Sequence, residues 1–294
     1  MHFLGYKNTS NALCKARGSG SFILGLLKRI WLCLPDALRM RAYSALAAVG
    51  KRLYDSDGSL QRLPFNLYLK YGPRVRSSEA LAMAIVAQYT TIPVPKMLDC
   101  LRGDRGVCIL MTCLPGTAFG QDQTLYDLSP DQVHDFGDTL RDWFAQLRSI
   151  PVPSNAIISS IDGSPCRSYR ISHDHDFGPF RSEDDLWDYR FHSVPRRHHP
   201  ELRVKLDTLR SRPHRLVFSH GDVHPNNFLV KDGRLTGWID WECAGWFPEY
   251  WDYGSALYLR AAYRPWCEIF TNIFPQYRPE LEVEDAFWKV ANPF

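Results

Sequence analysis

The sequence predicts an α+β fold in which a small N-terminal lobe, built on an antiparallel sheet, precedes a larger and mainly helical C-terminal lobe. Residues 65–71 alternate between apolar and polar side chains as a strand does, and residues 79–88 have the pattern of one main helix. Apolar residues repeat at helical spacing over 133–147, and residues 228–239 contain two apolar-rich runs around an Asp-Gly turn. A chain of 294 residues is long enough for two lobes around one cleft.

Composition and charge exclude several classes of protein. Hydrophobic residues make up 45% of the chain, as in a globular protein, and the formal net charge of +3 is too small for a nucleic-acid binder. The 8 cysteines are scattered without the close pairs of a zinc site, which indicates reduced thiols and a cytoplasmic protein. We therefore expect no nucleic-acid partner, and no motif indicates an oligomeric state.

Residues 1–44 are predicted to form a helical extension before the N-terminal lobe. Its apolar residues repeat at helical spacing at Leu24, Leu27, Ile30, Trp31 and Leu34. The apolar stretch of residues 21–34 contains Lys28 and Arg29 and is shorter than the roughly 20 residues that cross a bilayer. It also lacks the cleavage site of a secretion signal, so we expect no stable membrane insertion. Packing on the domain is the preferred interpretation, and peripheral membrane contact is the alternative.

Residues 45–113 are predicted to form the N-terminal lobe. A short hairpin is expected over 52–63, and the strand that follows carries Lys70. The next helix carries a single acid, Glu79. A lysine on a strand and a glutamate on the next helix form the ion pair that orients ATP in kinases, so we expect that pair here. The alternative is that Lys70 is solvated and Glu79 only stabilises the start of its helix.

Residues 114–294 are predicted to form the C-terminal lobe. Ser129 and Pro130 mark the start of its first long helix. Residues 154–200 lack clear periodicity except near 183–190, where four acids could attract a cationic acceptor or form the acidic first turn of an exposed helix. Nearby aromatic side chains could hold a cation or belong to the core, namely Trp187, Tyr189, Trp246, Tyr250 and Trp251.

The most informative stretch begins at His220 and places Asp222 five positions before Asn227. This is the spacing of the base and the metal-binding amide in the protein-kinase catalytic loop, H-R-D-x-x-x-x-N, with Gly221 in place of the arginine. Phosphoryl transfer needs a group that accepts the proton of the nucleophile and hard oxygen ligands for Mg²⁺. Asp240, thirteen residues after Asn227, is the candidate second ligand.

The predicted hairpin explains how these two ligands could meet. A turn centred on Asp232 and Gly233 pairs residue 230 with 235 and Phe228 with Gly237. Asn227 and Asp240 then lie at the same open end. The alternative interpretation is a surface hairpin whose flanking Asp and Asn only cap turns.

At this point the chain resembles a known family. His-Gly-Asp-x-x-x-x-Asn followed by Ile-Asp-Trp-Glu is similar to the aminoglycoside phosphotransferase and choline kinase family, whose fold is that of protein kinases. The resemblance implies a two-lobed protein-kinase-like fold, with ATP and Mg²⁺ as cofactors and the hydroxyl of a small molecule as acceptor. It implies that Asp222 is the catalytic base and that Asn227 and Asp240 bind Mg²⁺.

Further residues take their expected roles from the same resemblance. His220 would be a buried support of the catalytic loop, and Asp252 would steady that loop from the segment after Pro248. Lys70 would bind the ATP phosphates, held by Glu79. The backbone around Thr112 and Cys113, between the lobes, would bond the adenine edge.

One part of the chain departs from the kinase pattern. No G-x-G-x-x-G precedes Lys70, and the corresponding segment, residues 55–59, contains a single glycine. Because glycine-rich loops bring backbone N–H groups close to phosphate, this departure favours one alternative, a catalytically weak or inactive kinase-like binding module. A protein kinase is a further alternative, although no D-F-G or A-P-E segment follows the hairpin.

Overall fold

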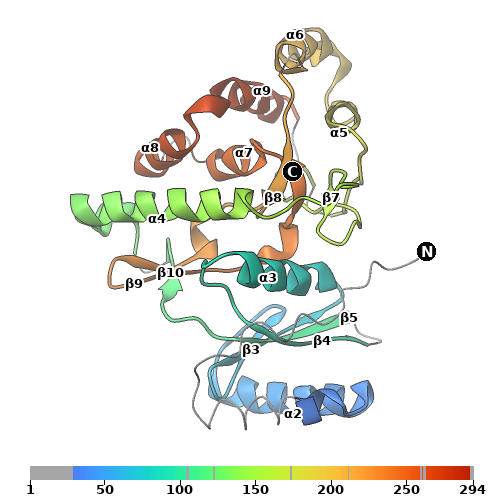
Figure 1. The fold of residues 1–294 in the computed structure, drawn as a ribbon, viewed down its shortest axis with the longest axis vertical. Helices are drawn as coiled ribbons and strands as arrows, with labels where there is room; N and C mark the ends of the chain where they lie inside the picture. Colours follow the sequence, from blue (N-terminus) through green and yellow to red (C-terminus); the bar gives the residue numbers. More distant parts are fainter. Residues whose placement is uncertain are drawn as a thin grey trace.

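The computed structural model confirms the α+β fold with an antiparallel sheet in the N-terminal lobe and a helical C-terminal lobe (Figure 1). It describes residues 29–103, 106–121, 123–172, 174–210, 212–258, 260 and 263–291. The first part of the predicted N-terminal extension, including Leu24 and Leu27, lies outside the described residues.

The sheet of the N-terminal lobe positions Lys70. Its strands are β1 (Ser56–Asp57), β2 (Leu60–Leu63), β3 (Leu67–Gly72), β4 (Met97–Gly103) and β5 (Gly106–Thr112), in the spatial order β1-β2-β3-β5-β4. Lys70 lies opposite Leu60 of β2 and Ile109 of β5, so strands on both sides hold its backbone. The hairpin expected over 52–63 is shorter than predicted, because the chain stays helical through Leu53.

Two helices cover opposite faces of this sheet (Figure 1). They are α2 (Asp36–Leu53) and α3 (Ser77–Tyr89), and α3 lies on the side of the C-terminal lobe. Helix α2 continues without a break across residues 44 and 45, where the predicted extension and lobe meet. Its residues Arg39 and Tyr43 both donate hydrogen bonds to Asp99 of β4. Trp31 in turn donates to the Tyr43 hydroxyl at 2.7 Å. The described part of the N-terminal segment therefore packs on α2, and no helix among the described residues is long and apolar enough to cross a membrane.

The C-terminal lobe is built around helix α4 (Pro130–Arg148). Ser129 and Gln132 form a capping box at its start, as the predicted helix beginning requires. The other helices are α5 (Glu183–Phe191), α6 (His199–Arg210), α7 (Trp251–Leu257), α8 (Arg264–Ile273) and α9 (Arg278–Trp288). Two three-stranded sheets complete the lobe, with strands β6 (Thr117–Ala118), β7 (Ser159–Ser160), β8 (Leu216–Ser219), β9 (Phe228–Lys231), β10 (Arg234–Trp238) and β11 (Gly245–Pro248).

The acidic turn at the start of α5 bonds within the chain. Glu183 accepts a hydrogen bond from Tyr250 at 2.6 Å, and Asp184 pairs with Arg210 at 2.6 Å. The aromatic side chains of Trp187, Trp246, Tyr250 and Trp251 are buried in the core. Glu183 and these four aromatic residues therefore support the fold, while Asp184, Asp185 and Asp188 are exposed, as in the structural alternative of an acidic first turn, and Tyr189 is half-buried.

His214 links α5 to α9 and makes stability depend on pH. Its two ring nitrogens lie 3.1 Å from Glu183 and 3.2 Å from Glu280, and its side chain is 4% exposed. Burial favours neutral imidazole, but the two carboxylates outweigh burial and raise the pKa of His214 to about 9. Because the pKa of His214 in the folded protein exceeds its ordinary value, the charged ring stabilises the fold. This stabilisation is full below pH about 6.5 and is lost as pH rises through about 9.

We expect His214→Gln to remove this pH dependence and to lower the free energy of unfolding by on the order of 1–3 kcal/mol at pH 6. Urea unfolding at pH 6 and at pH 9.5 measures the effect, which should be much smaller at the higher pH. His134→Gln is the matched control, because the His134 side chain is 77% exposed. An equal loss of stability at both pH values would contradict the prediction.

Candidate active site

The loop after β8 is organised around a buried, neutral His220. Its ring lies against Trp238 and Trp241, with centroid separations of 4.8 and 4.5 Å. The Nε2–H donates to the Ile239 carbonyl at 3.0 Å, and Nδ1 accepts the backbone N–H of Asp222 at 3.3 Å. Burial lowers the pKa of His220 to about 3, so the ring acts as one donor and one acceptor. This geometry fits the support role that the family resemblance implies.

Gly221 explains why the arginine of the kinase pattern is missing here. Its φ is +82°, and a Cβ at this position would lie 2.3 Å from the Cys243 carbonyl oxygen. A side chain would therefore meet both a strained backbone and a backbone clash. The loop can pass this close to the segment after Asp240 only with glycine.

Helix α7 holds the loop after β8 through two side chains. Asp252 accepts the N–H of Gly221 at 2.9 Å and the N–H of His220 at 3.3 Å. Ser255 accepts the N–H of Val223 at 2.9 Å. Sequence reasoning named Asp252 and missed Ser255, although a spacing of three residues places both on one helix face.

Asp222 and Asn227 face each other inside this loop. The Asn227 amide nitrogen donates to the Asp222 carbonyl at 2.9 Å and to its Oδ2 at 3.1 Å. Since the nitrogen is used in this way, the amide oxygen is the atom of Asn227 that can bind a metal. Burial, and next the charge of Asp240, raise the pKa of Asp222 to about 6. A carboxylate with a pKa near neutrality suits a general base.

The hairpin brings Asn227 and Asp240 to one end, with a register that differs from the prediction. Val230 pairs with Leu235 as expected, but Phe228 pairs with Trp238 and not with Gly237. The reason is a bulge between residues 235 and 237, which adds one residue to the second strand. The Ile239 N–H still donates to the Asn227 carbonyl at 2.8 Å, so Asp240 follows directly beside Asn227. Asp240 has a left-handed φ of +64°.

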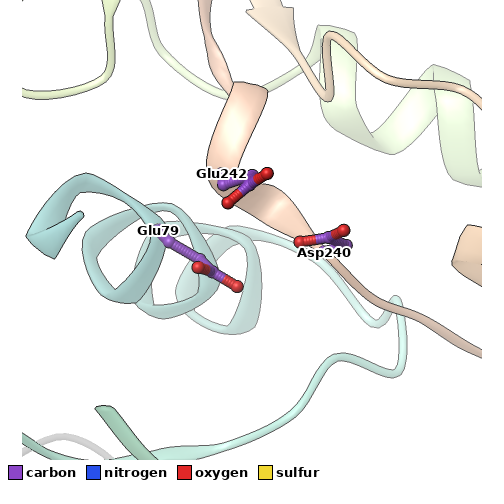
Figure 2. Close-up of side chains that lie close together, drawn as sticks. All are labelled: Glu79, Asp240 and Glu242. Atoms are coloured by element: carbon purple, nitrogen blue, oxygen red, sulfur yellow. The ribbon is translucent and has the colours of Figure 1, made fainter. Parts of the chain in front are cut away.

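Three carboxylates surround the amine of Lys70. Its Nζ lies 3.0 Å from Glu79, 2.7 Å from Asp240 and 3.5 Å from Glu242. Figure 2 shows Glu79 of helix α3 close to Asp240 and Glu242, the two acids that follow β10. Burial alone lowers the pKa of Lys70, but the three carboxylates outweigh burial and raise it above its ordinary value. The predicted ion pair of Lys70 and Glu79 is present. Asp240, at the end of the hairpin, pairs with the same amine.

Glu79 and Glu242 complete the electrostatic picture. Burial raises the pKa of Glu79 to about 7 against the opposing effect of Lys70. Glu242 also accepts a hydrogen bond from Tyr169 and lies 3.4 Å from Arg167. Sequence reasoning quoted Glu242 in the motif but gave it no role. Its position two residues after a candidate metal ligand was the only available signal.

The segment between the lobes uses some of its backbone donors within the chain. The Thr112 N–H donates to Lys96 at 3.1 Å, and the Cys113 N–H donates to Asn66 at 2.8 Å. Adenine contacts at these two residues would therefore use their carbonyl oxygens, and the next backbone donor along the chain is Leu114. The assignment of Thr112 and Cys113 to nucleotide binding stays a prediction.

The turn that should cover the phosphates is very short. Asp57 pairs with Leu60, so only Gly58 and Ser59 join β1 to β2. The Ser59 carbonyl accepts the N–H of Tyr71 at 2.8 Å, which places the turn beside the residue after Lys70. This tight turn replaces the glycine-rich loop of kinases and contains fewer backbone N–H groups.

Residues 70–282 match the model of the phosphotransferase enzyme family, and this range includes Lys70 and the whole segment from His220 to Asp252. The chain belongs to the phosphotransferase enzyme family. This membership confirms the resemblance drawn from His220–Asn227 and residues 239–242. No curated relative matches the chain.

Solved structures of family members share the protein-kinase-like fold. One is a thermostable variant of aminoglycoside phosphotransferase APH(4)-Ia in a ternary complex with AMP-PNP and hygromycin B. It has 14% sequence identity and a TM-score of 0.55, and the match covers 79% of this chain and 81% of that one. The GDP and kanamycin complex of APH(2")-IIia has 13% identity and a TM-score of 0.53, covering 83% and 86%. At identities this low, the structural likeness establishes the common fold alone.

Proposed function

We propose that the protein transfers the γ-phosphoryl group of ATP, in the presence of Mg²⁺, to a hydroxyl group of a small molecule. The observation that supports this most strongly is the meeting of Lys70, Glu79 and Asp240 beside the loop that carries Asp222. The pair of Lys70 and Glu79 in the N-terminal lobe and the two acids in the C-terminal lobe are the types of group that phosphoryl transfer uses. Residues 45–113 would supply the nucleotide-binding lobe, 114–294 the catalytic lobe and 1–44 the helical extension.

Each side chain has a proposed role that follows from its surroundings. Asp222 would accept the proton of the acceptor hydroxyl, since its raised pKa makes it a stronger base than an exposed aspartate. Lys70 would bind phosphate oxygens, with Glu79 holding its amine in place. His220 and Asp252 would keep the loop in position without contacting the substrate.

The donors at the hairpin end fit a magnesium ion. Asp240 offers a carboxylate and Asn227 an amide oxygen, which are the hard ligands that Mg²⁺ prefers. Three carboxylates around one lysine leave a local excess of negative charge, which favours a cation. When bound, the ion would neutralise charge on the phosphate oxygens.

The acceptor class rests on the family. The relatives named above bind hygromycin B or kanamycin, so a hydroxyl-bearing small molecule is the proposed acceptor here. The described cysteines are free thiols, which fits a reducing, cytoplasmic location. We name ATP and not GTP in this proposal because ATP is the commoner phosphoryl donor.

Incubation with ATP, Mg²⁺ and a metabolite extract tests the proposal. Mass spectrometry should detect a metabolite that gains one phosphoryl group and depends on active protein. The short turn at Gly58 and Ser59 favours a second candidate, an inactive kinase-like binding module. Calorimetric binding of Mg²⁺-ATP without any phosphorylated product from extracts or mixed proteins would favour that candidate, and phosphorylated protein would indicate a protein kinase.

A further inference from the structure

One of the carboxylates beside the Lys70 amine, that of Glu242, is itself held in place by other side chains. Asp240 lies 2.7 Å from this amine, but a metal bound by Asp240 would compete for the same oxygen. Glu79 and Glu242 then remain to orient Lys70 (Figure 2). Glu242 has a side chain only 12% exposed, and its position is set by Tyr169 and Arg167 of the segment after β7.

Arg167 connects Glu242 to the N-terminal lobe. Its Nη1 donates to the Arg74 carbonyl at 2.8 Å and lies 3.4 Å from Glu242. Its Nε donates to Asp176 at 3.0 Å. The Arg167 and Glu242 side chains are only 10% and 12% exposed, so the contact between these two is largely removed from water and is worth more than a surface ion pair.

Arg76 connects the same aspartate to helix α3. It is the residue immediately before Ser77, where α3 begins, and lies three residues before Glu79. Its Nη1 lies 3.4 Å from Asp176. Its Nη2 donates to Ser164 and, at 2.8 Å, to the Pro165 carbonyl. Asp176 therefore accepts a hydrogen bond from Arg167 of the C-terminal lobe and lies within ion-pair distance of Arg76 of the N-terminal lobe.

We infer that Arg76, Arg167 and Asp176 form an inter-lobe clamp that positions Lys70 for phosphate binding, through helix α3 and Glu79 on one side and through Glu242 on the other. These three are positioning residues. The inference rests on the proposed function, since it assigns to Lys70 a contact with nucleotide phosphate. The clamp compensates in part for the short turn at Gly58 and Ser59, because a lysine already held in place loses little freedom when it binds phosphate.

The variant Asp176→Asn tests the clamp. It keeps the size of the side chain and removes the charge shared by Arg76 and Arg167, and the Asp176 side chain is 34% exposed, so we expect the fold to persist. Calorimetry should show Mg²⁺-ATP binding weakened by about tenfold, as for other residues that orient a binding group. Adenosine affinity should stay within about twofold, because adenosine has no phosphate for Lys70.

Controls separate a positioning role from general damage. Asp174 and Asp176 both line a cavity of about 230 Å³, and Asp174 is exposed. Asp174→Asn makes the same chemical change there and should bind Mg²⁺-ATP like the wild type. Asp176→Glu keeps the charge and should recover most of the affinity. Combining Asp176→Asn with Glu242→Gln should weaken binding by less than the product of the two single effects.

Wild-type affinity of Asp176→Asn for Mg²⁺-ATP would overturn the inference. So would an equal loss of ATP and adenosine affinity, or the same loss in Asp174→Asn. The test uses binding, so it remains decisive if the wild type binds Mg²⁺-ATP but phosphorylates nothing, a result that contradicts the proposed reaction alone. A wild type that binds no Mg²⁺-ATP contradicts both.

Discussion

Asp222→Asn is expected to lower the rate of phosphoryl transfer by about 10²–10⁴-fold while leaving the fold intact. The substitution keeps the shape of the side chain and removes the base. The loop should keep its conformation, because Asp252 and Ser255 hold its backbone at residues 220, 221 and 223. Steady-state release of ADP with an identified acceptor measures the rate, and thermal unfolding reports on the fold.

A matched control lies in the same hairpin. Asp232 is an exposed turn residue with a φ of +55°, a conformation that asparagine also adopts readily. Asp232→Asn makes the same chemical change at the far end of the hairpin and should keep the rate within about twofold, as a surface substitution does. If Asp222→Asn turned over as fast as this control, Asp222 would not be the base.

Glu284→Ala is expected to destabilise the protein by about 3–5 kcal/mol. Glu284 is fully buried and accepts hydrogen bonds from Nη1 and Nη2 of Arg190, at 2.6 and 2.9 Å. Arg170, also buried, lies 3.3 Å from the same carboxylate. Burial alone raises the pKa of Glu284, but the two arginines outweigh it and lower that pKa. The variant leaves two buried cations without their shared anion.

Urea unfolding measures this loss, and Glu282→Ala on the same helix is its control. The Glu282 side chain is 67% exposed and lies 3.7 Å from Arg278, so its removal should cost less than about 1 kcal/mol. A similar small effect for Glu284→Ala would contradict the prediction. The cluster also bears on function, because Arg170 anchors the segment that contains Arg167 and Tyr169 of the Lys70 surroundings.

Local patterns predicted those parts of the fold that depend on nearby residues. Ser129 and Gln132 bond across three positions, so the start of α4 is readable from their spacing. The Asp232–Gly233 turn likewise predicts the hairpin that brings Asn227 and Asp240 together. The bulge after Leu235 was not predictable, since it depends on how β10 packs, and this shifted the partner of Phe228 by one residue.

Contacts between distant segments were visible only where a motif linked them. The pair of Lys70 and Glu79 was expected because a strand and the next helix carry it, nine residues apart. The contact between Arg76 and Asp176 joins two loops whose charged residues resemble ordinary solvated side chains in the sequence. Ser255 and Glu242 were given no role, because their short spacing from Asp252 and Asp240 does not reveal that they contact Val223 and Lys70.

The sequence by itself determined which residues make up the candidate site, through the spacing of His220, Asp222 and Asn227 and the hairpin that leads to Asp240. These relations are short in sequence and follow from backbone geometry. Only the tertiary structure decided what else surrounds Lys70, namely Asp240, Glu242 and the clamp at Asp176. The physical reason is that burial and charge pairing are set by segments up to about 170 residues apart, which meet only when both lobes have packed.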